Sequence, residues 1–108
     1  MTKDGIPESV RKQVDDIVDL FNQQVVEDPN YSYTTRYEGI FLYLYKISLG
    51  VHLPICRLKY TGSMDDWEFV IYQYNTQSYN PDERLFSGSR CVDGTVEGAL
   101  RAGLEAYP

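Results

Sequence analysis

The side chains that could perform catalysis are few and have no evident partners. His52 is the only histidine of the sequence and follows Gly50 in a predicted turn, where a solvated histidine is expected. Cys91 lies two residues before Asp93, and no helix N-terminus or basic neighbour clearly activates its thiol. Neither residue has the neighbour that a general base or a nucleophile requires.

Two pairs of adjacent carboxylates are the strongest acidic constellations. Asp65-Asp66 and Asp82-Glu83 each stand in a predicted turn, where acidic pairs are usually solvated rather than bound to a metal. The sequence has no glycine-rich phosphate loop, no zinc-ligand spacing and no nucleophile elbow. We therefore expect no metal and no cofactor. The sequence leaves catalysis open but favours a protein that is not an enzyme.

Cysteine spacing and hydropathy indicate the cellular compartment in which the protein is expected. Cys56 and Cys91 are 35 positions apart and belong to no CxxC pair. The sequence lacks an N-terminal apolar stretch after a basic segment, the mark of a secretory signal, and lacks a run of the ~18–20 apolar residues that a membrane span requires. We therefore expect a cytoplasmic protein with two free thiols and no membrane contact.

Length and charge limit the class of protein. A chain of 108 residues, 43% hydrophobic and 24% charged, is expected to form one globular domain over residues 1–108. Its net charge of −6 argues against general nucleic-acid binding, which depends on neutralisation of phosphates by Lys and Arg. The charge is uneven, because residues 31–60 hold four basic side chains against Glu38 alone.

Two stretches have the periodicity of amphipathic helices. Residues 7–27 carry apolar side chains at three- and four-residue spacing and end before a proline-containing turn. Residues 95–106 form the second helix, for which Thr95 or Asp93 supplies the N-terminal cap. Gly103 lies on the apolar face of this helix, where it would let the helix backbone approach a sheet closely.

The stretches between the helices have the composition and alternation of strands. Residues 36–48, 55–61 and 67–75 are expected to form a three-stranded antiparallel meander, because their connections are short. A short fourth edge strand near residues 84–88 is an option. Two amphipathic helices need one apolar sheet face to pack on. The predicted fold is therefore an α+β two-layer sandwich of order α-β-β-β-α, with both helices on one face of the sheet.

The first expected strand has large apolar side chains on both of its faces, in the stretch YEGIFLYLYKI. Because tyrosine tolerates partial exposure, we expect Ile40, Leu42 and Leu44 to face the helices; the reverse orientation would expose those three instead. Charged residues fix the outward side of the other two strands. Seven residues then form the candidate binding face: Phe41, Tyr43, Tyr45, Arg57, Lys59, Tyr72 and Tyr74.

An uncovered face rich in aromatic side chains indicates a contact surface, because monomers rarely expose large contiguous apolar patches. Residues 76–92 or the C-terminal tail, a protein partner or a ligand would each serve as a cover. Enrichment in Tyr and Arg is typical of the centre of a protein interface, so we expect a non-catalytic interaction module or homodimer. The alternative is single-stranded nucleic acid stacked on the tyrosines beside Arg57 and Lys59, which the net charge disfavours.

Two partial resemblances involve the predicted elements. The order α-β-β-β-α resembles that of double-stranded RNA-binding domains, an analogy of fold alone, because the last helix has Arg101 but no lysine cluster. TVEGALRAGLEA, residues 95–106, is similar to the helix that follows the sheet in HicB-type antitoxins. It covers 12 of 108 residues and carries no function over. The matching residues are Thr95, Glu97, Ala99, Leu100, Glu105 and Ala106, while Gly98, Gly103 and Leu104 depart from the pattern.

Overall fold

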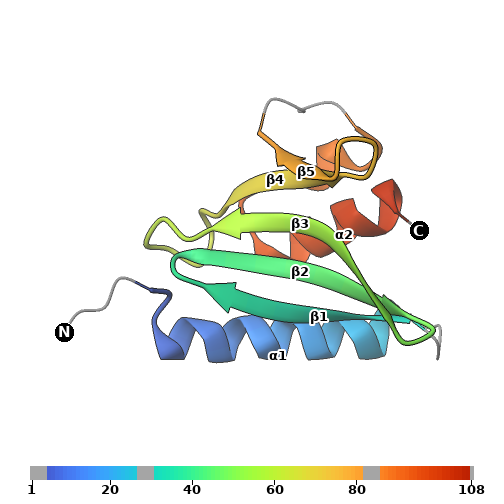
Figure 1. The fold of residues 1–108 in the computed structure, drawn as a ribbon. Coiled ribbons are helices and arrows are strands. Elements are labelled where there is room, and N and C mark those ends of the chain that lie inside the picture. The colour runs from blue at the N-terminus through green and yellow to red at the C-terminus, as the bar shows by residue number, and fades with distance from the viewer. Residues whose placement is uncertain (1–4, 27–30, 82–85, 108) are drawn as a thin grey trace.

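The computed structural model describes residues 5–26, 31–81 and 86–107. Its five strands form one antiparallel sheet in the order β1-β2-β3-β4-β5. Figure 1 shows α1 alongside β1 and α2 behind β3 and β4, on the same side of the sheet. The predicted α+β fold, with two helices on one face of an antiparallel sheet, is confirmed. The elements are α1 (Glu8–Gln24), β1 (Tyr31–Glu38), β2 (Phe41–Ser48), β3 (Val51–Lys59), β4 (Glu68–Gln73), β5 (Ser78–Asn80), the 3-10 helix η1 (Ser89–Cys91) and α2 (Val96–Ala106).

The sheet has five strands rather than three, chiefly because residues 36–48 belong to two strands. β1 and β2 are joined by a turn at Gly39, whose φ of +61° is accessible to glycine at little cost. The two strands then pair along their whole length, from Tyr31 with Ser48 to Glu38 with Phe41. The expectation of one continuous strand was wrong because it gave no weight to Gly39 as a turn residue.

The other strand boundaries also shift. β3 starts at Val51 rather than residue 55, so His52 lies in a strand opposite Ile47 and not in a turn. The strand that follows β4 is β5 at residues 78–80, and the edge strand expected near 84–88 falls partly outside the described residues. Residues 86–88 have no strand pairing, and residues 82–85 lie outside the described residues. A three-residue strand is too short to give an alternation pattern in the sequence.

The core lies between the helices and one face of the sheet. Leu42 and Leu44 are fully buried, which confirms the expected orientation of this apolar stretch, whereas Ile40 lies in the turn before β2. A register shift after Leu44 leaves both Ile55 and Cys56 of β3 buried. The remaining buried hydrophobic residues include Val10, Val14, Val18 and Phe21 from α1, Tyr33, Leu58 and Ile71 from the sheet, and Val96, Ala99, Leu100 and Ala102 from α2.

Tyr33 of β1 joins the sheet to both helices. Its ring centroid lies 5.9 Å from that of Phe21 in α1, and its hydroxyl donates to the Leu100 carbonyl of α2 over 3.1 Å. The Asn22 side chain accepts from the Tyr33 N–H at 2.8 Å and donates to the Tyr33 carbonyl at 3.0 Å. Asn22 therefore satisfies backbone groups of an edge strand, which would otherwise be open to another chain.

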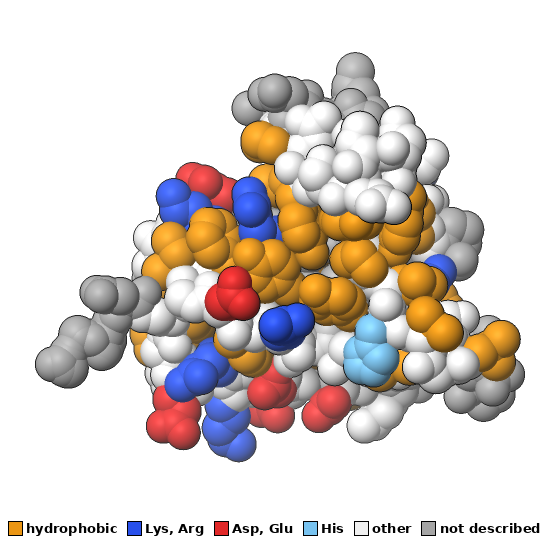
Figure 2. Space-filling model, in the orientation of Figure 1, with side chains coloured by type: hydrophobic (Ala, Val, Ile, Leu, Met, Phe, Trp, Pro, Cys, Tyr) orange, Lys and Arg blue, Asp and Glu red, His pale blue; other side chains and the backbone are white. Residues whose placement is uncertain are grey.

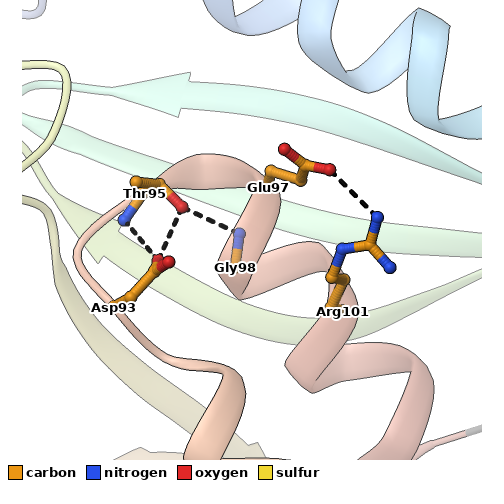
Figure 3. A network of polar contacts seen from close by, with 5 residues as sticks. All are labelled: Asp93, Thr95, Glu97, Gly98 and Arg101. Carbon is orange, nitrogen blue, oxygen red and sulfur yellow. Dashed lines mark hydrogen bonds and ion pairs between the residues drawn. The ribbon is translucent and has the colours of Figure 1, made fainter.

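Two side chains cap α2, as Figure 3 shows. Thr95 Oγ1 accepts a hydrogen bond from the Gly98 N–H at 2.9 Å. Asp93 Oδ1 accepts from the N–H and the hydroxyl of Thr95, at 3.1 and 2.6 Å. These bonds lower the pKa of Asp93 below its ordinary value. Both residues expected as alternatives thus act together, and the beginning of α2 is fixed by its own sequence.

Gly103 lies where α2 comes closest to the sheet. A Cβ there would lie 2.6 Å from both Ile55 Cγ2 and Tyr33 Oη, and both of those residues are buried. We expect Gly103→Ala to lower the free energy of unfolding by about 1–3 kcal/mol through overpacking. This loss should outweigh the gain of about 1 kcal/mol in helix propensity. Urea unfolding measures the difference.

Tyr33→Phe is the matched partner for this test because it removes one of the two atoms that the new methyl group would meet. Gly103→Ala should cost less in the Tyr33→Phe background than in the wild type. If Gly103→Ala were as stable as the wild type, the close contact between α2 and the sheet would not be a constraint on the fold.

Candidate interaction face

The sheet face opposite the helices carries a connected set of apolar side chains. On β2, Phe41, Tyr43 and Tyr45 alternate with the buried Leu42 and Leu44 and so project to this side. All three are half-buried. Figure 2 shows apolar side chains as a continuous band across the middle of this face, with charged groups beside it. We name this surface the open face and define it by Phe41, Tyr43, Tyr45, Ile47, Arg57, Lys59, Val70, Tyr72 and Tyr79.

Tyr79 of β5 is at the centre of the aromatic contacts on the open face. It is paired with Tyr72 of β4, and its ring centroid lies 5.0 Å from that of Tyr72 and 5.5 Å from that of Tyr43. The guanidinium of Arg57 lies 5.4 Å from the Tyr79 ring and 4.8 Å from the Phe41 ring. The chain thus covers part of this face itself, through the β4–β5 hairpin.

Tyr74 has a different position from the other predicted residues. It follows β4, is 41% exposed, and lies with its ring 4.9 Å from Tyr72 and 5.1 Å from Tyr107. Its hydroxyl donates to the Pro54 carbonyl at 2.5 Å. The Tyr107 hydroxyl in turn donates to the Tyr72 carbonyl. Tyr74 therefore links the open face to the residue that follows α2.

Six of the seven predicted residues lie on strands and point to the open side, and Tyr74 stands at the end of β4. Their participation in binding stays a prediction. Tyr79 was missed, because its strand is only Ser78–Asn80 and lies in a segment without a readable pattern. Its only sequence signal is an aromatic residue between two polar ones, which occurs too often by chance to identify a strand.

Charges of both signs surround the aromatic rings. Arg36 of β1 is opposite Tyr43, while Lys59 of β3 is opposite Phe41 on one side and Glu68 on the other. Together with Arg57 and Glu38, the outward positions of the sheet hold three basic and two acidic side chains. This side of the molecule is therefore close to neutral, whereas the chain as a whole has a net charge of −6.

The hydroxyls of Tyr74 and Tyr79 are neutral hydrogen-bonding groups. Burial is the main cause that raises the pKa of Tyr74 to about 12 and the pKa of Tyr79 above its ordinary range. The Tyr79 hydroxyl oxygen is buried and has no hydrogen-bond partner of ordinary geometry, although Tyr45 is near enough to raise its pKa further. These phenols can donate hydrogen bonds but are poorly suited to act as bases near neutral pH.

The residues considered for catalysis do not come together in the described part of the chain. His52 is exposed on β3, and Asp65 and Asp66 are exposed in a turn. Cys91 Sγ donates to Glu105 Oε2 at 3.2 Å, which raises the pKa of the thiol. Asp82 and Glu83 lie outside the described residues.

The described residues contain neither a cluster of metal-ligating side chains nor a helix that could span a membrane. Over residues 5–26, 31–81 and 86–107, no group of three or more His, Cys, Asp or Glu side chains could hold a metal ion. No helix in these ranges is long and apolar enough to cross a membrane.

Comparison with known proteins identifies no relative of this chain. No protein-family model, no curated protein and no solved structure matches the chain. The partial resemblances to HicB-type antitoxins and to double-stranded RNA-binding domains thus gain no support. The open face is therefore the feature of the molecule from which a function can be inferred.

Two tyrosine-to-phenylalanine variants test the described hydrogen bonding. Tyr79→Phe removes a buried hydroxyl without a partner, so the free energy of unfolding should stay unchanged or rise by up to about 1 kcal/mol. Tyr74→Phe removes the hydrogen bond to the Pro54 carbonyl and should lower the free energy of unfolding by about 0.5–1.5 kcal/mol. Chemical unfolding measures both, and the reverse order would contradict the described contacts.

Proposed function

We propose that this protein is a small, non-catalytic interaction module that associates with a second copy of itself through the open face. The aromatic set on a sheet face without a helix is the observation that most supports the proposal. Tyr43, Tyr72 and Tyr79 form one cluster there, with Arg57 beside Tyr79. Tyr and Arg are among the residue types that dominate binding energy in protein interfaces.

The dimensions of the sheet are compatible with a weak dimer. Its longest strands have eight or nine residues. At about 3.3 Å per residue and about 4.8 Å between strands, the sheet has an area of about 500 Å². Two copies packed face to face would therefore bury about 1,000 Å² in total, near the lower limit for a specific interface.

Charge also favours contact through the open face over contact through the helices. The sheet carries three basic and two acidic outward side chains, so two copies can pair opposite charges around a two-fold axis. The helices carry a surplus of acidic side chains, and two helix layers would repel each other. In the proposed dimer the two sheets lie inside and the helix layers outside.

Tyr43→Asp combined with Tyr72→Asp tests the proposal. Two carboxylates in the middle of the apolar band should abolish association while the chain stays folded, because both tyrosines are on the side away from the core. The measurement is molar mass by light scattering behind size exclusion over a hundredfold range of concentration. The wild type should move from 12.5 kDa toward twice that value, whereas the variant stays at 12.5 kDa.

A variant with the same added charge on the helix side is the matched control. Ser9→Asp with Gln13→Asp places two carboxylates on exposed positions of α1 and should dimerise like the wild type. If the wild type were a monomer at every concentration, the open face would not be a self-interface. If the tyrosine variant unfolded, as judged by circular dichroism, those side chains would belong to the core and the proposal would fail.

Single-stranded nucleic acid is the second candidate partner. Arg57 and Lys59 lie beside the aromatic rings, as a stacking surface for bases would need. The guanidinium of Arg57, however, already lies over the Phe41 and Tyr79 rings, where a base would have to stack. This contact and the net charge of −6 make a protein partner the better-supported proposal.

A titration separates the two candidates. If nucleic acid binds, mixed-sequence single strands at low salt should change the tyrosine fluorescence, and affinity should fall as salt rises. Arg57→Ala with Lys59→Ala should then reduce the slope of log affinity against log salt by up to about two. An unchanged fluorescence at low salt would remove this alternative.

A further inference from the structure

The backbone of Tyr107, the residue that follows α2, is bonded to α2, β1 and β2. Its N–H donates to the Gly103 carbonyl of α2 at 2.8 Å. Its carbonyl accepts hydrogen bonds from Tyr31 Oη of β1 at 3.3 Å and from Lys46 Nζ of β2 at 3.2 Å. Because α2, β1 and β2 all contribute buried residues to the core, the backbone of Tyr107 is a fixed point of the molecule.

The side chain of Tyr107 extends from this fixed point to the end of β4. Its hydroxyl donates to the Tyr72 carbonyl. Its ring centroid lies 5.1 Å from that of Tyr74, with the two rings at 83° to each other. The Tyr74 hydroxyl in turn donates to the Pro54 carbonyl of β3 at 2.5 Å. Tyr107 thus contacts β4 directly, and contacts β3 through Tyr74.

These hydroxyl groups lie where β3 and β4 stop pairing. The last pair of the two strands is Cys56 with Ile71, so Tyr72 lies beyond the end of their pairing. On the β3 side, Pro54 has no N–H with which to continue it. Hydrogen bonds from tyrosine hydroxyls therefore take the place of strand pairing at this end of the sheet.

β4 continues past this point into the hairpin with β5, which supplies two tyrosines to the open face. Gln73 is paired with Ser78 and Tyr72 with Tyr79. The rings of the second pair lie 5.0 Å apart, and the Tyr79 ring lies 5.5 Å from that of Tyr43 on β2. A movement of this hairpin would therefore separate Tyr72 and Tyr79 from Tyr43.

We infer that Tyr107 positions the β4–β5 hairpin and thereby sets the affinity of the open face for a second copy. The inference rests on the proposed function and adds a control from outside the open face, because Tyr107 is not one of the residues that define it. A hairpin that is held keeps Tyr72 and Tyr79 ordered before contact, so binding need not order them. When the hairpin is released, only the fraction of chains that keep it in place can bind.

Tyr107→Phe and Tyr107→Ala test the hold on the hairpin in two steps. Phe keeps the ring contact with Tyr74 but loses the hydrogen bond to the Tyr72 carbonyl, whereas Ala loses both. Hydrogen–deuterium exchange of residues 71–80 is followed by mass spectrometry in dilute protein. Exchange should be about 3–10 times faster in Tyr107→Phe than in the wild type, and faster still in Tyr107→Ala.

Sedimentation equilibrium of the same proteins measures the dissociation constant of the dimer. If about one chain in three of Tyr107→Ala keeps the hairpin in place, the constant should rise about tenfold, because the fraction enters once for each copy. Tyr107→Phe should raise it by a smaller factor. Tyr37→Phe is the matched control, since it removes a hydroxyl that donates to the Arg11 carbonyl and the Asp15 carboxylate, away from the hairpin. It should change neither the exchange of residues 71–80 nor the dissociation constant.

Three results would overturn the inference. The first is equal exchange of residues 71–80 in Tyr107→Ala and the wild type, and the second is equal acceleration in the Tyr37→Phe control. The third is an unchanged dissociation constant despite faster exchange, which would leave the proposed dimer intact but independent of Tyr107. A wild type that is monomeric at every concentration would instead remove the dimer and its control together. If Tyr107→Ala did not fold, as judged by circular dichroism, Tyr107→Phe would decide both measurements.

Discussion

The arrangement of the two layers depends on the position of Tyr33. Its ring lies against Phe21 of α1, its hydroxyl is bonded to the backbone of α2, and its own backbone is held by Asn22. The hydroxyl reaches α2 beside Gly103, where a larger residue would collide with it. Both helices are thereby fixed to one face of the sheet. No helix of the described residues packs on the opposite face, so this face must be stabilised by its own side chains.

The open face shows how a sheet with apolar residues on both sides remains compatible with water. Tyr43, Tyr72 and Tyr79 pack edge to face, so each ring covers part of its neighbour, and the Arg57 guanidinium lies over the ring of Tyr79. Edge-to-face packing of this kind contributes about 0.5–1.5 kcal/mol per pair beyond burial. The chain itself thus covers part of the second apolar side of residues 37–47, and the half-buried remainder is the surface that we propose contacts a second copy.

Sequence reasoning predicted the layers better than the strands, for identifiable physical reasons. Leu42 and Leu44 were oriented correctly because tyrosine, unlike leucine, keeps a polar atom that can reach water. The beginning of α2 followed from the capping ability of Thr95 and Asp93. β1 was largely missed, although Tyr31, Tyr33, Thr35 and Tyr37 alternate with polar residues, because tyrosine and threonine give a weak hydrophobic period. Tyr79 could not be predicted, because its strand β5 has only three residues and is recognised only by its pairing with β4.

The contacts already made within the open face also affect the affinity that it can reach. Binding normally costs about 0.5–1.5 kcal/mol for each side chain that becomes fixed, and an interface of about 1,000 Å² has little surplus to meet this cost. In the monomer, Tyr79 and Arg57 are already held by several ring contacts. The face is therefore pre-organised, and a partner need not order these groups. A small surface can in this way associate specifically, although the same contacts reduce the apolar area that is left to bury.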